Sequence, residues 1–509
     1  MLNEIESPRM FFNRKQWVKK SLAAVSLSVL GLGLTMTSPM VSAADGFESM
    51  TPFSRVAKIK VVKEGGEVDY VATYQRSKAI AKAIAAYVAR SVESDLLGSD
   101  VIRGGDWKLG GTTQECLDNP TGVDADGNPI CDDAEVYGAI LAIPSPEPIN
   151  PHDQTYLDTG VVTPANTKKA NVLEFCNKKY ASLAMGVDPI VDTRKVVNGY
   201  AHAPILPCKV SVWNDDKHIY VDMLDPSAIF SLFFSDVLFS ADMQDPVFAE
   251  ALSAMPPQVK NEIKEIIYAV LADFDAPSET MDQKIGPKYN SIEDIIVAVA
   301  SSPLQSPYLH MTYMREDGNA FSDSDSKKVA QAIINTMSLH GTSGAGKHTT
   351  EITEDLDGNT VTDVNNDGLI NLDDALSGGS SWRSARHEPI TVPGKNHIIE
   401  ACSPKYAKMA MSTGLHHVNA LPCKISVKLI ANNTKLVVSY LDPFFMLGAL
   451  FADITDEEKE QFANIPGIIN RDLQNMVKAA IDVNVNILDS DGNPVSLTDP
   501  VRKEINMLP

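Results

Sequence analysis

The stretch "VTDVNNDGLINLDDALSGG", residues 361–379, places oxygen-bearing side chains at alternate positions around one glycine. Alternate residues of such a loop point inward, so that their oxygens can converge on one hard cation such as calcium. The pattern D-x-[DN]-x-[DN]-G begins at Asp363, and Gly368 occupies its sharp turn. The predicted ligands are Asp363, Asn365, Asp367, the backbone carbonyl of Leu369, Asn371 and Asp374. The spacing predicts a calcium site, and the alternative is a polar turn without metal.

This loop resembles the calcium loops of EF-hands, and especially the dockerin type, which ends in Asp instead of Glu. Two features differ from a full EF-hand. The preceding segment, residues 344–362, does not have a helical pattern, so the entering helix is missing. Asp374 is also shorter than the usual glutamate. The resemblance therefore implies a calcium ion that holds a loop in shape.

Cysteine and histidine form a second set of candidates. Six cysteines follow residue 43, and an even number in an exported chain favours disulfides. The predicted pairs are Cys116–Cys131, Cys176–Cys208 and Cys402–Cys423. His202 and His417 each stand six residues before the second cysteine of a repeated pair. A transition-metal or haem site, or a redox-active dithiol, is therefore the alternative to the two repeated disulfides.

These residues recur because the chain contains two similar halves. "LEFCNKKYASLAM" from Leu173 and "IEACSPKYAKMAM" from Ile399 are identical at seven of thirteen positions. "LPCKVSV" from Leu206 and "LPCKISV" from Leu421 agree at six of seven, and "LDP" follows at Leu224 and Leu441. The constant order of these matches predicts two tandem copies of one domain. Glu174 and Glu400 recur as well, either in a local salt bridge or cap, or lining a shared cleft.

Each copy has the same predicted plan. An extended apolar segment precedes an Ala-rich helix, a long polar insertion, a strand ending at a cysteine, and a helix through "KYAxxAM". Two alternating strands then form a hairpin, and a helix begins after the LDP proline. We therefore predict an α+β fold of two small antiparallel sheets, each packed by helices on one side. The expected copies span residues 50–280, with an insertion at about 105–168, and residues 290–509, with an insertion at about 341–394.

The cysteine-ended strand, the "KYAxxAM" helix and the "LPCK(V/I)SV" hairpin strand together resemble the domain of unknown function 302 family. The resemblance covers residues 171–234 and 396–451 and leaves out both insertions. It implies a small α+β fold that often pairs in dimers. It implies no reaction, because the family has no settled activity.

The first residues have the pattern of an export signal: Arg14, Lys15, Lys19 and Lys20 closely precede the apolar run "SLAAVSLSVLGLGLTM", and "VSA" ends at residue 43. The true start is either Met1 or Met10. The segment 1–43 carries five basic and two acidic residues, so its removal changes the formal net charge from −22 to −25. Such acidity argues against nucleic acid and anionic membranes as partners. No later segment is long enough to span a membrane, so we expect an exported, periplasmic or extracellular protein.

No catalytic pattern stands out in the sequence. We therefore expect a non-enzymatic binding or interaction protein with structural calcium, whose partner is an unidentified protein or small ligand. The two copies are expected either to pair within the chain or to mediate dimerisation. One alternative is a periplasmic redox, metal or haem-handling protein that uses the repeated Cys-His-Cys sets. Another is dockerin-like, calcium-dependent assembly on a partner.

Overall fold

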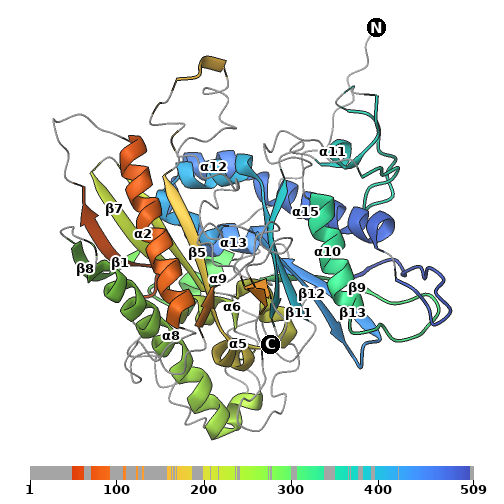
Figure 1. Cartoon of the computed structure of the whole chain (residues 1–509), viewed down its shortest axis with the longest axis horizontal. Helices are drawn as coiled ribbons and strands as arrows, with labels where there is room; N and C mark the ends of the chain where they lie inside the picture. The colour runs from red at the N-terminus through yellow and green to blue at the C-terminus, as the bar shows by residue number, and fades with distance from the viewer. Residues whose placement is uncertain are drawn as a thin grey trace. The chain divides into compact units, whose positions relative to one another are not determined.

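Two six-stranded antiparallel sheets, one for each copy, form the framework of the described residues (Figure 1). The computed structural model describes residues 49–61, 70–91, 107–109, 122–123, 129–130, 158–161, 163, 167, 169–185, 199–206, 208–215, 217–234, 237, 241–272, 274, 278–299, 307–337, 350–364, 366, 368–376, 382–390, 396–421, 423–485 and 487–504. At some of these positions, Cys176 among them, only the backbone is described. The expected signal segment lies outside these ranges.

The first sheet has the order β2-β5-β6-β7-β1-β8. Its strands are β1 (Phe53–Lys60), β2 (Trp107–Leu109), β5 (Ala170–Asn177), β6 (Cys208–Asn214), β7 (His218–Leu224) and β8 (Ser278–Ile285). The helices of this copy are α2 (Tyr70–Ser91), α5 (Lys178–Ala184), η3 (Gly199–Ile205), α6 (Pro226–Phe233), η4 (Ala241–Gln244) and α8 (Pro246–Ala272). Within the insertion, β3 (Gly122–Val123) pairs with β4 (Pro129–Ile130).

The second sheet repeats this order as β10-β11-β12-β13-β9-β14. Its strands are β9 (Tyr308–Tyr313), β10 (Arg383–Ile390), β11 (Asn396–Cys402), β12 (Cys423–Ile430), β13 (Lys435–Leu441) and β14 (Val501–Glu504). The accompanying helices are α9 (Ile292–Val299), α10 (Asp325–Met337), α11 (Leu372–Ala375), α12 (Pro404–Ser412), η5 (Leu415–Ala420), α13 (Pro443–Leu450), α14 (Asp456–Phe462), α15 (Ile465–Ala479) and η6 (Ala480–Asn484). The predicted α+β class and the duplication are therefore confirmed.

The edge strands β8 and β14 are new relative to the predicted plan. β8 pairs with β1 and extends the first sheet to residue 285, beyond the expected boundary at 280. β14 pairs with β9 in the equivalent position of the second sheet.

None of the described helices combines the length and the apolar character that a membrane crossing needs.

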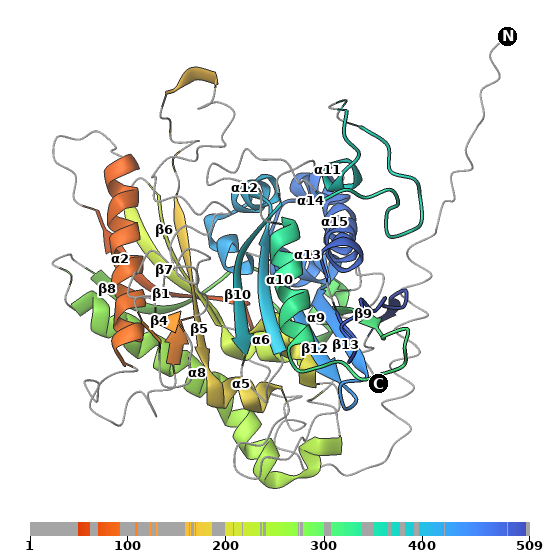
Figure 2. The ribbon, with the colours of Figure 1, turned by 45° about the vertical axis from the view of Figure 1, so that its right-hand side comes forward.

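One face of each sheet is covered by its own helices, as predicted. Helix α2 packs on β5 and β6, and α10 packs on β10, β11 and β12 (Figures 1 and 2). Because successive side chains of a strand alternate between faces, Val210 and Val212 enter the core under these helices while Lys209 and Ser211 point the other way.

The opposite, more polar face of each sheet is covered by the other copy. The short helix η5 of the second copy lies on β5, β6 and β7, and η3 of the first copy lies on β11, β12 and β13. The LDP helices also meet, since the rings of Phe233 and Phe445 are 5.3 Å apart and Tyr308 donates a hydrogen bond to the carbonyl of Phe233. This exchange buries both faces of the central strands.

Candidate functional site: the calcium loop and the histidine cluster

The loop around Gly368 has the hydrogen bonds of a closed turn. The backbone N–H of Gly368 donates to Asp363 Oδ2 at 2.9 Å. Gly368 has a φ of 84° and Asn366 a φ of 58°, and both residue types tolerate this left-handed conformation. The Asp363 carboxylate therefore folds back over the turn and accepts from its glycine.

Asp374 ties the end of the loop to its beginning. Its carboxylate accepts hydrogen bonds from the backbone N–H of Val364 at 2.9 Å and of Asn371 at 3.0 Å. Asn371 is buried and caps helix α11 by accepting from the N–H of Asp373. The predicted ligands Asp363, Asn371 and Asp374 thus belong to one closed loop, and the Leu369 side chain is 58% exposed. The remaining two, Asn365 and Asp367, lie outside the described residues, so calcium stays a prediction.

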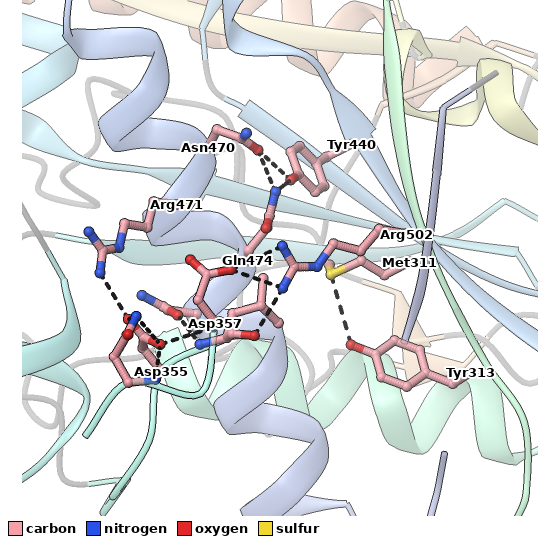
Figure 3. A network of polar contacts seen from close by, with 12 residues as sticks. Met311, Tyr313, Asp355, Asp357, Tyr440, Asn470, Arg471, Gln474 and Arg502 are labelled. Carbon is pink, nitrogen blue, oxygen red and sulfur yellow. Dashed lines mark hydrogen bonds and ion pairs between the residues drawn. The ribbon is translucent and has the colours of Figure 1, made fainter. Parts of the chain in front are cut away.

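Two turns outside the predicted calcium loop, at Asp355 and Asp489, have the sequence D-x-D-G-N. They show which groups can satisfy the carboxylates of such a turn. Asp355 accepts hydrogen bonds from Asn359 and Arg471, and Arg502 contacts Asp357 (Figure 3). Arginine thus supplies the positive charge at this turn. In the other turn, Asp489 accepts from the backbone N–H groups of Asp491 and Asn493.

The repeated cysteines do not form the predicted disulfides in this structure, which has Cys208, Cys402 and Cys423 as thiols. The sheet register explains the difference. Ala401 pairs with Cys423, so Cys402 is the next residue along and its side chain belongs to the opposite face. Phe175 pairs with Cys208 in the same way, which gives Cys176 the same offset. The third predicted pair, Cys116–Cys131, lies outside the described residues.

Burial also opposes thiolate chemistry at these positions. It raises the pKa of the Cys208 thiol to about 12 and that of the Cys423 thiol to about 11. The thiolate is the nucleophile and the metal-binding form, so both groups are poor candidates for a redox dithiol at neutral pH.

Charged residues beside these thiols connect the two copies. Glu174 is the cross-strand neighbour of Lys209 in the first sheet, and Glu400 is that of Lys424 in the second. Lys424 Nζ lies 3.0 Å from Glu174 Oε1, with both side chains 1% exposed, and it donates to the carbonyl of Leu206. Burial and the charge of Lys424 lower the pKa of Lys209 to about 8. Glu174 therefore pairs with a lysine of the other copy, whereas the sequence suggested a local salt bridge or cap, or a shared cleft.

The two predicted histidines, His202 and His417, are both fully buried. Nδ1 of His202 lies 3.1 Å from the carbonyl of Ala184, and its ring packs on Phe234 at 4.3 Å. His417 packs on Phe451 at 4.4 Å in the same manner. The shared aromatic contact confirms that these histidines occupy equivalent positions.

His417 differs from His202 in its polar neighbours. Nε2 of His417 and Nε2 of His416 lie 3.0 Å from the two carboxylate oxygens of Asp453. Burial would raise the pKa of Asp453, but the hydrogen bonds with His416 and His417 hold it well below its usual range. Burial lowers the pKa of His417, and the bond to Asp453 offsets this only in part.

Residues 163–255 and 390–471 both match the family model for the domain of unknown function DUF302. The two matched regions support two tandem copies of a domain similar to this family. The matched regions contain the cysteine-ended strands, the hairpins and the LDP helices, and they leave out the predicted calcium loop. No curated protein matches the chain.

His416 and Asp453 are the site residues that the sequence interpretation missed. A signal for them existed in the duplication. Aligning the DUF302 copies at "LPCK" sets His416 opposite Ala201, and aligning them at "LDP" sets Asp453 opposite Asp236. The histidine pair, present in one copy and not at the aligned positions of the other, was thus visible in the sequence, whereas its contact with Asp453 was not.

Proposed function

We propose that this chain is an exported, non-enzymatic binding or interaction protein, built on two DUF302 copies, in which calcium orders the insertion of the second copy. The main support for calcium comes from the hydrogen bonds that close the loop of residues 363–374. Asp363 accepts from Gly368, and Asp374 accepts from both Val364 and Asn371. Carboxylates held at the first and last positions of a twelve-residue loop support a site for a hard cation.

The packing of the insertion supports a structural role for the ion. Val361, which precedes the loop, and Leu372, near its end, belong to the hydrophobic core of the second copy. Between these two anchors, Val364, Leu369 and Ile370 are exposed. This segment has little apolar burial of its own, so calcium would supply the stabilisation that packing does not.

The same exposed side chains support an interaction role. Val364 is 68% exposed, Leu369 58% and Ile370 44%, all within one short loop. Apolar side chains that remain exposed together are typical of surfaces that bind other molecules. Calcium would hold them in one arrangement and reduce the entropy lost on binding.

The redox alternative has weaker support. It needs two cysteines close together with accessible thiolates, whereas the register separates each repeated pair and burial raises the pKa of Cys208 and Cys423.

Thermal unfolding tests the calcium proposal. Calcium at about 100 times its dissociation constant contributes about 2.7 kcal/mol, which corresponds to a rise in Tm of roughly 5–10 °C for a domain of this size. Chelator should reverse the rise, and Asp363→Ala, Asp367→Ala or Asp374→Ala should abolish it. Asp489→Ala is the matched control, because it alters a similar turn outside the loop. A Tm that is the same in calcium and in chelator would show that the loop is a metal-free turn.

A further inference from the structure

We infer that the second DUF302 copy contains a site for a divalent transition metal, formed by His416, His417 and Asp453. One donor atom from each side chain lies within 4.8 Å of the other two. Across the described ranges, no other three His, Cys, Asp or Glu side chains bring donor atoms this close. The site is separate from the calcium loop and does not depend on the proposed function.

The hydrogen bonds around His417 direct the lone pair of its Nε2 toward Asp453. Thr413 donates its single hydroxyl hydrogen to the carbonyl of Ala410 at 2.7 Å. The Thr413 oxygen must therefore accept from Nδ1–H of His417, which lies 2.8 Å away. In the neutral imidazole, Nε2 then carries the lone pair and faces Asp453 Oδ1 at 3.0 Å. Two acceptors at this distance need a cation between them.

The adjacent histidine makes a metal ion a better cation than a proton. Nε2 of His416 lies 3.0 Å from the second oxygen of the same carboxylate. Two imidazole nitrogens and a carboxylate therefore converge, and the Nδ1–H of His417 is held by Thr413 on the far side. A second hydrogen bond that fixes the ring of a metal-binding histidine is the usual support of such sites.

Close packing holds the two rings in place. A Cβ added at Gly414 would lie 2.6 Å from Cε1 of His416, so this position needs glycine. Phe53 of the first copy contacts both imidazoles, with ring centroids 5.5 Å from His416 and 6.0 Å from His417. Phe451 covers the other side of His417. The ligands are thus positioned before any metal arrives.

The donor set selects the class of metal. Imidazole nitrogen with one carboxylate suits Zn²⁺, Fe²⁺, Co²⁺, Ni²⁺ or Cu²⁺, whereas calcium prefers oxygen ligands only. The side chains of His416 and Asp453 are 21% and 26% exposed, so one side of the site faces solvent. Coordination positions that the three residues leave open are accessible to water or to a small ligand.

Only the second copy has this donor set. The first copy has Ala201 where the second has His416. The histidine that it has at the position equivalent to His417, His202, places Nδ1 3.1 Å from the carbonyl of Ala184. The prediction is one transition-metal ion per chain and not two.

Titration of the full chain with Co²⁺, followed by calorimetry and visible absorption, tests the inference. We expect one bound ion per chain, displaced by Zn²⁺ and unaffected by millimolar calcium. His416→Ala and Asp453→Asn should each weaken binding at least tenfold, and Thr413→Val about 10-fold to 100-fold through the lost support of His417.

His218→Ala is the matched control, because His218 is a partly exposed histidine beside a single carboxylate, Asp215. It should bind Co²⁺ like the parent chain. Both His416 and Asp453 are partly exposed, so their variants should fold, and circular dichroism checks this. Co²⁺ binding that is unchanged in both variants, or absent from the folded parent chain, would overturn the assignment.

Discussion

The two copies use different chemistry at the same pair of positions. Arg55 and Asp222 are cross-strand partners in the first sheet, and His310 and Ser439 are partners at the equivalent place in the second. Arg55 makes a two-point ion pair with Asp222 and lies 4.1 Å over the Tyr220 ring. His310 and Ser439 instead form a hydrogen bond of 2.6 Å. An ion pair in the first copy thus corresponds to a hydrogen-bonded histidine in the second copy, and histidine has an ordinary pKa of about 6.5.

This difference predicts a pH dependence that originates in the second copy. Burial, with a contribution from His202, lowers the pKa of His310 from 6.5 to about 4. Between pH 6.5 and 4 the unfolded chain binds a proton there and the folded chain does not, so stability falls as the pH is lowered through this window. The full depression corresponds to at most about 3 kcal/mol.

His310→Gln removes the titration and retains a polar side chain. The free energy of unfolding, measured with urea at several pH values between 4 and 7, should then depend less steeply on pH. Some slope should remain, because burial also lowers the pKa of His417. An unchanged slope in the variant would contradict the assignment to His310.

Local signals predicted the repeated elements well. The prolines of "LDP" mark the first residues of α6 and α13, and Asp225 and Asp442 cap these helices as the sequence pattern requires. The hairpin turn at "ANNT" has three successive left-handed residues, Ala431 to Asn433. Elements defined by neighbours in sequence were therefore accessible to prediction.

Elements that depend on partners far away in the sequence could not be predicted from local patterns. Strand β8 has the polar sequence "SETMDQKI", and it exists because β1 pairs with it more than 200 residues away. Helix α8 begins at Pro246 and continues through Pro256 and Pro257, although proline inside a helix disfavours it locally. Packing of Phe248 and Leu252 into the core compensates for these prolines.

The caps permit a matched test. Asp442 accepts from the backbone N–H groups of Phe444 and Phe445. Asp442→Ala should lower the free energy of unfolding by about 1–2 kcal/mol. Asp225→Ala should also lower it, because Asp225 caps α6 and in addition accepts from Ser54 and Lys260.

Asp456→Ala serves as the comparison in denaturant titrations. Asp456 lies in the first turn of α14, is almost fully exposed and does not cap its helix. Its removal should change stability by less than about 0.5 kcal/mol. Equal losses in all three variants would argue against a special role for the two caps.

At the scale of the whole molecule, the polar faces of the two sheets are interior surfaces. Glu174 and Lys424 lie in alternating strands, and such polar positions usually face water. For Glu174 the sequence suggested a local salt bridge or cap, or a shared cleft. The ion pair with Lys424 instead depends on the pairing of the copies, which removes both residues from solvent. Duplication could be predicted from sequence, whereas the surface by which the copies meet could not.

A double-mutant cycle measures this contact. Lys424→Met should destabilise the chain by about 3–5 kcal/mol, because it leaves Glu174 buried without its partner. Glu174→Gln combined with Lys424→Met should recover much of the loss. The exposed pair Lys459 and Asp456 provides the reference, with an expected cost below about 1 kcal/mol on removal of Lys459. If Lys424→Met costs no more than this reference, the buried pair does not hold the copies together.

The exchange of η3 and η5 between the copies has a further consequence. In a dimer of separate chains, such an interface dissociates on dilution. Here both halves of the interface belong to one polypeptide, so its formation is unimolecular and each half meets the other at a fixed effective concentration. A protein released into a large volume, where its own concentration is low, would keep this interface assembled at any dilution.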